Sequence, residues 1–569
     1  MRAVRAPVWL VTAASLALTA WLLAAGCGGR MATTIDASGR EYFGNVRVPG
    51  ERVFRFNNAA EPEQLDPGLM SGQPDGRIAR AIFEGLVVAD PRTLAPLPGQ
   101  AYRWEISPDG RRYVFHMRPG IRWTNGRPVT AGDFEWSWKR VLDPATGSRY
   151  AGILSVIEDA DSFNQKRADA SQVGVRALDD STLEVRLASP TPYFLNLLTF
   201  YTCLPVPREV VARFGDRWTR PEHLVSNGPF VLKAWKLRES MELVKNPAYW
   251  DAANVKLDRM IAYPVDDQTT STNMYKAGMI DWQPSGNVPA PFLPFMRKYA
   301  DFKVGRQQAL YFYSINVTKK PLDNVWVRRA LTHALDRATL CDKVLKGTRP
   351  PWGLFCPSGY AGYTPPAPVT YDPEEARRDL AKAGYPGGKG FPRVEILINT
   401  SEDHRRIAEA VQAMWRANLG IPVDVANQEW ASYLEKTTQV KYDIARRSWI
   451  GDYPDPSTFL DIMRGGDGNN RTGWSNPQYD RLCAEAHAEA DPARRMKLLS
   501  QAEALLLEES PVIPIYHYVT MELVKPYVRG LYPTVLDYHP LKFVSIDPDW
   551  RQHPEPQTPD STLAAKPQP

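Results

Sequence analysis

The segment RRSWIGDYPDPSTF, residues 446–459, combines charged and aromatic residues in the manner of a binding site. Arg446 lies at one end of a strand-like run, and Trp449, Asp452 and Tyr453 lie toward the other. Because a buried charge is costly unless it is paired, these residues indicate a pocket for a ligand with both charge signs, such as a zwitterionic peptide. Taken alone, the segment is better explained by an internal Arg446–Asp452 salt bridge among core aromatic residues.

Two side chains upstream occupy positions from which they could reach a ligand. His404 stands at the start of a predicted helix, where backbone amides favour an anion and the imidazole adds a donor. Trp430 ends the strand-like run VANQEW and could cover a pocket. Each has an ordinary alternative, because a lone His is commonly a surface residue and a lone Trp commonly belongs to the core.

No arrangement of nucleophile, base or metal ligands points to an enzyme. The sequence contains no GxSxG, no Cys/His/Asn arrangement typical of a protease and no phosphate-cradling glycine loop. Asp443, Asp452, Asp455 and Asp461 lie close together in sequence, which leaves a glycosidase with paired carboxylates formally open. The eight His are scattered and no CxxC occurs, so we expect no metal and no other cofactor.

The size and charge of the chain bound its architecture and its partners. At 569 residues it is too long for a single core, so two or three domains are expected. Its 69 basic and 64 acidic residues nearly balance, and no basic tract is interleaved with aromatic residues. Nucleic acid is therefore not expected as a partner.

Hydrophobic patterns predict a mixture of strands and helices between the chain ends. Alternation predicts strands at 111–117 and 182–187 in the first half. The second half contains two strand–helix–strand units, which imply an α/β arrangement with a parallel sheet. The predicted helices cover residues 373–383, 403–418 and 493–509, and the strands that follow the last two cover 421–430 and 512–519.

The N-terminus has the pattern of a bacterial export signal. Arg2 and Arg5 precede an apolar run over residues 6–25, which ends in small residues and Cys27. The ending LAAGC resembles a lipoprotein signal, in which Cys27 becomes the lipidated first residue; an uncleaved membrane-spanning helix is the competing interpretation. We expect an exported protein on the periplasmic or cell-surface face that is anchored to the membrane by its lipid.

The chain ends and the remaining cysteines give weaker expectations. After a signal peptide at 1–26, residues 27–45 are predicted to form a tether, and residues 551–569, rich in Pro and Gln, a disordered tail. Outside the cytoplasm a disulfide is permitted, and the pairing stays open. The cysteines concerned are Cys203, Cys341, Cys356 and Cys483.

From about residue 57 to residue 543 the sequence closely resembles the periplasmic oligopeptide-binding proteins of ATP-binding-cassette (ABC) importers. The matching segments, in order, include IFEGLV, SNGPF, KNPAYWD, VRRALTHALDR, NTSEDHRR, NQEW and RRSWIGDYPDPSTFL. NQEW together with R-x-x-W-x-x-D-Y favours the oligopeptide branch of this family over the dipeptide, nickel and sugar branches.

The resemblance implies an α/β fold, the two-lobed periplasmic-binding-protein fold of class II (cluster C), with an additional domain inserted in the first lobe. A two-strand hinge would join the lobes, and closure around a ligand would be a hinge motion. The implied parts are 46–83, 208–308 and 520–550 for lobe I, 84–207 for the inserted domain, and 309–519 for lobe II.

The resemblance also implies a function. It describes a monomeric receptor, not an enzyme, that captures short peptides and delivers them to an ABC permease and ATPase complex. Three alternatives stay open: a receptor on the same scaffold for cell-wall peptides or another solute, a peptide-sensing receptor for a signalling partner, and, from another class, a hydrolase.

Ligand-binding roles carry over from the family to matching positions. Asp452 matches the acid that pairs with the α-ammonium group of the peptide. Arg446 and His404 match cationic or donor groups that meet the peptide carboxylate. Trp430 and Trp449 match aromatic residues that line side-chain pockets.

Backbone contacts also carry over. The strand that contains Ser448 and Ile450, and the loop at Gly72 and Gln73, would bond the peptide main chain as a strand bonds its neighbour. One departure lies beside this loop, because Ser71 stands where some relatives carry an acid near the amino end of the ligand. Preferred peptide length and side chains stay undetermined by the sequence.

Overall fold

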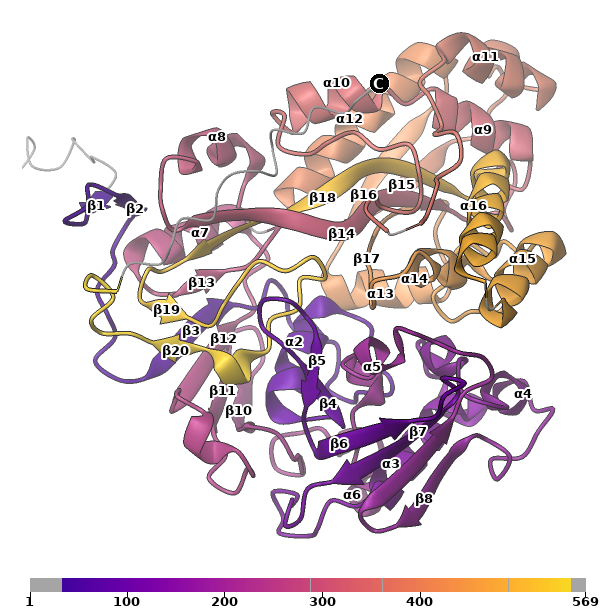
Figure 1. Ribbon diagram of the computed structural model, residues 1–569. Coiled ribbons are helices and arrows are strands. Elements are labelled where there is room, and N and C mark those ends of the chain that lie inside the picture. Colours follow the sequence, from indigo (N-terminus) through magenta and orange to yellow (C-terminus); the bar gives the residue numbers. More distant parts are fainter. Residues whose placement is uncertain (1–32, 287, 361, 490, 554–569) are drawn as a thin grey trace, which may run out of the picture.

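The computed structural model describes residues 33–553, except residues 287, 361 and 490 (Figure 1). The predicted signal peptide, the lipidation site at Cys27 and the tail from residue 554 onward lie outside the described residues. In the described part of the chain, no helix is long and apolar enough to cross a membrane.

A ten-stranded sheet runs through both lobes in the order β10-β11-β12-β3-β13-β18-β14-β17-β15-β16. Two long central strands, β14 (Phe302–Ile315) and β18 (Val512–Val524), pair antiparallel and pass from one lobe to the other (Figure 1). Their pairing shifts register between Arg306 and Leu310, where the two lobes meet. The other strands are β10 (Phe230–Lys236), β11 (Ser240–Lys245), β12 (Arg259–Tyr263), β3 (Val53–Asn57), β13 (Trp282–Gln283), β17 (Ile444–Ile450), β15 (Val394–Asn399) and β16 (Val423–Gln428).

The lobe II half of this sheet confirms one predicted strand–helix–strand unit and corrects the other. Strands β15 and β16 are parallel neighbours joined by α12 (Glu402–Leu419). The second predicted unit passes through α16 (Pro492–Glu509) into β18, but β14 lies between β17 and β18 and is antiparallel to both. The sheet is therefore mixed rather than parallel, because the hinge strand β14 is inserted in it.

Local sequence explains where these helices begin and end. The Asp372 carboxylate accepts the N–H of Glu375 at 2.9 Å at the start of α11 (Pro373–Lys382). Gly420 takes a left-handed conformation, with φ 70°, directly after α12. The predicted helices at 373–383 and 403–418 are thus confirmed to within a few residues.

Trp430 corrects a sequence prediction. It does not end a strand: β16 stops at Gln428, and Trp430 is the first residue of α13 (Trp430–Thr438). The Glu429 carboxylate accepts the N–H of Ala431 at 2.9 Å and so caps the helix. Because Glu is a less common cap than Ser, Thr, Asp or Asn, the sequence carried no strong helix-start signal there.

A four-stranded antiparallel sheet forms the inserted domain, in the order β6-β7-β9-β8. The predicted strands at 111–117 and 182–187 are β7 (Arg112–Met117) and β9 (Thr182–Arg186); the others are β6 (Ala101–Ile106) and β8 (Val175–Asp179). Helix α3 (Ala131–Leu142) packs on this sheet, and its Glu135 carboxylate accepts the N–H of Ala177 at 2.8 Å. The exact domain bounds given above stay a prediction.

A short hairpin corrects the predicted tether. Strands β1 (Thr33–Ile35) and β2 (Glu41–Phe43) pair with each other, and the N–H of Phe43 donates to the Asp301 carboxylate at 2.9 Å. The chain from Thr33 onward is therefore part of the folded body rather than a free spacer. The four cysteines, Cys203, Cys341, Cys356 and Cys483, are buried and free, so none of them forms a disulfide with another.

Candidate ligand-binding site

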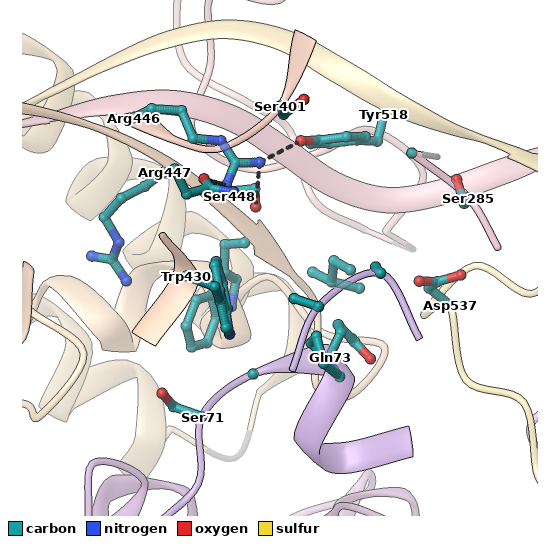
Figure 2. Close-up of a pocket in the computed structure, with 18 of the residues that line it drawn as sticks. Ser71, Gln73, Ser285, Ser401, Trp430, Arg446, Arg447, Ser448, Tyr518 and Asp537 are labelled. Carbon is teal, nitrogen blue, oxygen red and sulfur yellow. Dashed lines mark hydrogen bonds between the residues drawn. The ribbon is translucent and has the colours of Figure 1, made fainter. Parts of the chain in front are cut away.

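A cavity of about 290 Å³ lies between the lobes and is also lined by the inserted domain (Figure 2). It contains every residue for which the sequence predicted ligand contact. These residues are Gly72, Gln73, His404, Trp430, Arg446, Ser448, Trp449, Ile450 and Asp452. Their convergence places the predicted contacts in one cavity, while their roles toward a ligand stay predictions.

Arg446 is fixed in the cavity wall by neutral polar groups. It projects from β17 with 7% of its surface exposed, and its guanidinium donates to Ser448 Oγ at 3.2 Å and Tyr518 OH at 3.1 Å (Figure 2). It also donates to Asn399 Oδ1 at 3.2 Å. It also lies 5.0 Å from the centre of the Tyr311 ring. The guanidinium is thus oriented without any carboxylate to neutralise it among the described residues.

His404 lies beside this arginine in the first turn of α12. Its Nδ1 is 3.5 Å from the hydroxyl of Tyr311. Burial and the positive charge of Arg446 lower the pKa of His404 well below its ordinary value. His404 is therefore neutral near pH 7, so it is available to a ligand as a hydrogen-bond donor rather than as a cation.

Asp452 lies beyond the other end of β17, and its carboxylate makes no hydrogen bond or ion pair with any residue that the structure describes. The internal Arg446–Asp452 salt bridge, which the segment alone favoured, is therefore wrong. Burial raises the pKa of Asp452 well above its ordinary value, although the attraction of Arg80 opposes this. The backbone is held by Thr458, whose Oγ1 accepts the N–H of Asp452 at 2.8 Å.

Two aromatic stacks border the cavity. Trp449 stacks on Tyr150 of the inserted domain, with ring centres 5.8 Å apart and planes 26° apart. Trp430 stacks on Tyr433 at 5.7 Å and 21°. A Cβ atom at Gly72 would lie 3.4 Å from Trp430, so the lobe I loop closely approaches this second stack from across the cleft.

Strand β17 presents a free edge to the cavity. The N–H of Gly451 donates to the carbonyl of Gln308 at 2.8 Å, on the side of β14. Because alternate residues direct their backbone groups to the same side, Ser448 and Ile450 direct theirs to the opposite side. On that side, β15 pairs only with residues 444–445, so among the residues that the structure describes the strand has no neighbour farther along. An extended ligand could pair with this edge.

Several lining residues escaped the sequence analysis. Arg447 and Arg471 are both buried with 5% of their surface exposed, and both line the cavity. Arg447 directly follows a predicted ligand residue, but Arg471 lies in the Asn- and Gly-containing segment GNNRTGW, which has the composition of an ordinary turn. Further lining residues from other segments are Tyr150, Tyr201, Arg349, Tyr518 and Asp537, and Ser71, which the sequence analysis noted only as a departure from relatives, also lines the cavity.

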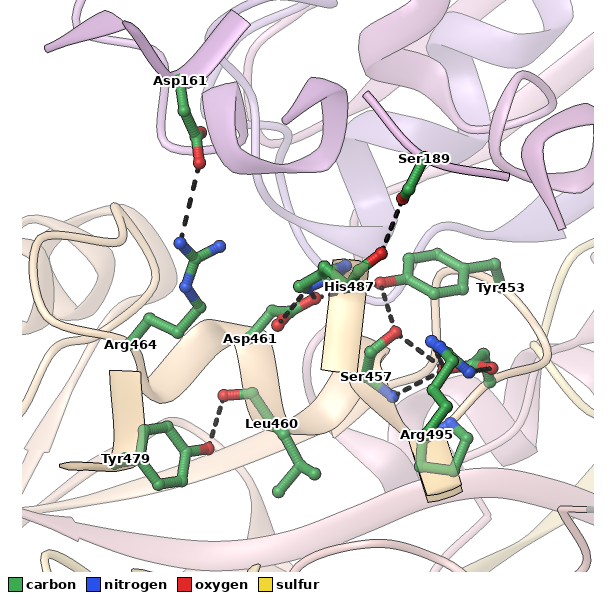
Figure 3. Close-up of polar contacts among 12 residues, drawn as sticks. Asp161, Ser189, Tyr453, Ser457, Leu460, Asp461, Arg464, Tyr479, His487 and Arg495 are labelled. Atoms are coloured by element: carbon green, nitrogen blue, oxygen red, sulfur yellow. Dashed lines mark hydrogen bonds and ion pairs between the residues drawn. The ribbon is translucent and has the colours of Figure 1, made fainter. Parts of the chain in front are cut away.

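The cleft is closed by contacts between lobe II and the inserted domain (Figure 3). The Ser189 hydroxyl donates to the carbonyl of His487 at 2.6 Å, and Arg464 lies 3.6 Å from the Asp161 carboxylate. On the other side of the cavity, the Thr269 hydroxyl of lobe I donates to Glu402 of lobe II at 2.8 Å. These contacts require the lobes to be close together.

The sequence also matches a family model, that of the bacterial extracellular solute-binding proteins, family 5 Middle, over residues 95–471. The chain belongs to this family. It is 37% identical over 524 residues to the oligopeptide-binding protein OppA of Bacillus subtilis (strain 168), covering 90% of this chain and 94% of that protein. It is 36% identical over 498 residues to the probable deoxycholate-binding periplasmic protein YgiS of Escherichia coli (strain K12), covering 85% of this chain and 92% of that protein.

A solved family member indicates which conformation this is. One structure of the murein tripeptide binding protein MppA of Escherichia coli matches with a TM-score of 0.83 and 33% identity, covering 88% of this chain and 99% of that one. The unliganded open form of MppA matches with a TM-score of only 0.57 at 34% identity, covering 88% and 98%. Since the sequence similarity is the same, the difference reflects lobe arrangement, in agreement with the contacts across the cleft.

Proposed function

We propose that this chain is a receptor that captures short peptides in the closed cavity and delivers them to an ABC importer. The observation that carries the proposal is the free edge of β17, with the Arg446 guanidinium toward one end and the Asp452 carboxylate beyond the other. An extended peptide has backbone groups that can hydrogen-bond to this edge, and its two termini carry the charges that pair with Arg446 and Asp452.

The nine predicted residues then divide into three roles. Asp452 pairs with the α-ammonium group, and Arg446 and the neutral His404 donate to the carboxylate. Backbone groups of Ser448 and Ile450, with the loop at Gly72 and Gln73, bond the peptide main chain. Trp430 and Trp449 line the spaces that take side chains. Main-chain bonding of this kind gives affinity that tolerates different sequences.

Calorimetry with a free tripeptide and its N-acetylated form tests this function. Acetylation removes the positive charge that Asp452 pairs with, so we expect the free peptide to bind much more tightly. Equal affinities would show that Asp452 does not bind the α-ammonium group of the peptide. Deoxycholate carries a carboxylate but no ammonium group, so tight binding of deoxycholate with no binding of peptides would overturn the peptide function. Hydrolysis of the bound peptide would overturn a purely binding role.

The membrane attachment is a separate part of the proposal. We infer that the exported chain is lipidated at Cys27, because of the LAAGC ending, and acts as a monomer at the outer face of the membrane. Metabolic labelling with an alkyne fatty acid is expected to mark the wild-type chain but not the Cys27→Ser variant. Labelling of both would contradict lipidation at this residue.

A further inference from the structure

Arg447 and Arg471, hereafter the cationic pair, form a buried positive feature of the cavity wall that the proposed binding of peptide termini does not use. Arg471 donates to Thr437 Oγ1 at 3.1 Å and to Ser71 Oγ at 3.4 Å. Arg447 donates to the carbonyl of Asn469 at 2.9 Å. All of these acceptors are neutral.

The charge of the cationic pair is not balanced by the protein. Within the described chain, neither arginine has a carboxylate within 4.0 Å, and Nε of Arg471 is buried without a hydrogen-bond partner. A third arginine nearby, Arg149, is already paired with Glu63 at 2.8 Å. Burial, together with the charges of Arg447 and Arg149, lowers the pKa of Arg471 to about 9.

Asp467, whose charge acts on Arg447, is a poor counter-charge. Asp467 lies beyond ion-pair distance of both arginines, and burial raises its pKa to about 7. Its Oδ1 already accepts the N–H of Asn469 at 2.7 Å. Because a buried unpaired cation is costly, an anionic group of the ligand placed here would gain more than it would in water.

The cationic pair lies at the Asp452 end of the cavity. Arg149 donates to Ser71, the residue that Arg471 also contacts, and the neighbouring Tyr150 stacks on Trp449 at 5.8 Å. Trp449 and Asp452 both bond Thr458, at 2.8 Å each. Arg446 instead faces Asn399 and Tyr518.

We propose, on the basis of the peptide-binding function above, that the cationic pair is a subsite for the side-chain carboxylate of Asp or Glu in the first two residues of the peptide. Asp452 would hold the α-ammonium group close by, so the C-terminal carboxylate of a peptide longer than two residues lies toward Arg446. Two guanidinium groups offer planar donors that match a carboxylate and not a neutral amide.

The test uses tetrapeptides with free termini, with Glu or Gln at position 1 or 2 and Ala elsewhere, measured by calorimetry. We expect wild-type protein to prefer Glu over Gln by about tenfold at one of these positions, as for a hydrogen bond to a charged group. The Arg471→Gln variant is expected to reduce this ratio to about one. Arg167→Gln, which removes an exposed arginine of the inserted domain, provides the matched control and is expected to keep the ratio.

The outcomes separate this inference from the function on which it rests. A Glu-to-Gln ratio near one at both positions in the wild-type protein, with tight binding of tetra-alanine, would overturn the subsite and leave the receptor function intact. Failure of every tetrapeptide to bind would overturn both. If Arg471→Gln instead abolished the preference for a free over an amidated C-terminus, the cationic pair would bind the terminal carboxylate, and the inference would be wrong.

Discussion

The two ends of β17 hold opposite charges in very different surroundings. At one end, the Arg446 guanidinium makes three hydrogen bonds to neutral groups and stacks on Tyr311. Beyond the other end, the Asp452 carboxylate has no hydrogen-bond or ion-pair partner among the residues described. The protein thus stabilises the Arg446 guanidinium with its own neutral groups, whereas the Asp452 carboxylate lacks, in the described part of the chain, a partner that a ligand could supply.

This difference indicates where ligand binding contributes most. A half-buried charge that lacks a partner, such as that of Asp452, depends on the ligand to compensate for its desolvation, whereas a charge already bonded to protein groups gains less from one more partner. We therefore expect recognition of the amino end of a peptide to be stronger than recognition of its carboxyl end. Variants at the two ends should therefore differ in the size of their effects on peptide affinity.

Removal of the Asp452 charge is expected to have the largest effect. In Asp452→Asn, a tripeptide with a free amino group should lose about thirtyfold or more in affinity, because truncating one partner of a buried charge pair costs about 2 kcal/mol or more. The N-acetylated tripeptide should bind both proteins alike. Calorimetry measures both affinities.

The same variant should be more stable than the wild-type protein without ligand, because the half-buried Asp452 carboxylate has no partner in the described chain that offsets its partial loss of hydration. Thermal unfolding checks this opposite change in stability. Asp169→Asn, at an exposed position of the inserted domain, is the matched control and should change neither quantity. A variant that lost affinity for free and acetylated peptides equally would show that Asp452 supports the cavity rather than the amino group.

Affinity for free-amine peptides should also depend on pH. The pKa of Asp452 is raised by burial, so the carboxylate takes up a proton as the pH falls through this raised value, well above the ordinary range of a carboxyl group. Since only the ionised form pairs with an ammonium group, affinity should be greatest above that pKa and fall below it, by at most about tenfold per pH unit. Binding near the raised pKa should release a proton.

Calorimetry in two buffers of different ionisation enthalpy measures this proton release. Asp467, whose pKa is raised to about 7, is a second carboxyl group that exchanges protons near neutral pH, and it is present in Asp452→Asn as well. Proton release that disappears in Asp452→Asn therefore belongs to Asp452. Release that persists in that variant would instead assign it to Asp467 or to another group.

Much of the fold around β17 was predictable from the sequence. Strong local signals marked several elements: alternation marked β7, Pro at the start and Gly384 after the end marked α11, and apolar positions at helical spacing with Gly420 after the end marked α12. The family resemblance predicted that Arg446, His404 and Asp452 share a site, and the structure places them around one cavity.

Features that depend on distant contacts were not predictable. Nothing in the local pattern of 302–315 shows that this strand spans both lobes, because its pairing with 512–524 is set by the whole sheet. From its local sequence, Arg471 is expected to be a solvated turn residue. Its contact with Ser71 of the other lobe appears only in the folded structure. Trp430 was misplaced because its helix cap, Glu429, is a weak signal.

The better-bonded end of β17 should give a smaller effect. In Arg446→Gln, the preference for a peptide with a free carboxylate over its C-terminal amide should fall by about tenfold, as for one hydrogen bond to a charged group. Arg329→Gln, a half-buried arginine that does not line the cavity, provides a charge-matched comparison. A loss that equalled or exceeded that of Asp452→Asn would reverse the proposed order of the two ends.

Loss of a closing contact that touches neither end should have the smallest effect. Arg464 reaches Asp161 of the inserted domain at 3.6 Å across the mouth of the cleft, and both side chains are partly exposed. Since such pairs contribute about 0.2–1 kcal/mol, Arg464→Gln should weaken binding of all peptides by about twofold, regardless of their termini. Small-angle X-ray scattering should show a slightly larger radius of gyration without ligand, because the closed state is less favoured.

The control is Arg481→Gln, at an exposed position on α15 (Pro477–Ala488), which should change neither measurement. A loss confined to peptides with free amino groups would mean that Arg464 acts on the Asp452 end, and closure could not then be separated from recognition of charge.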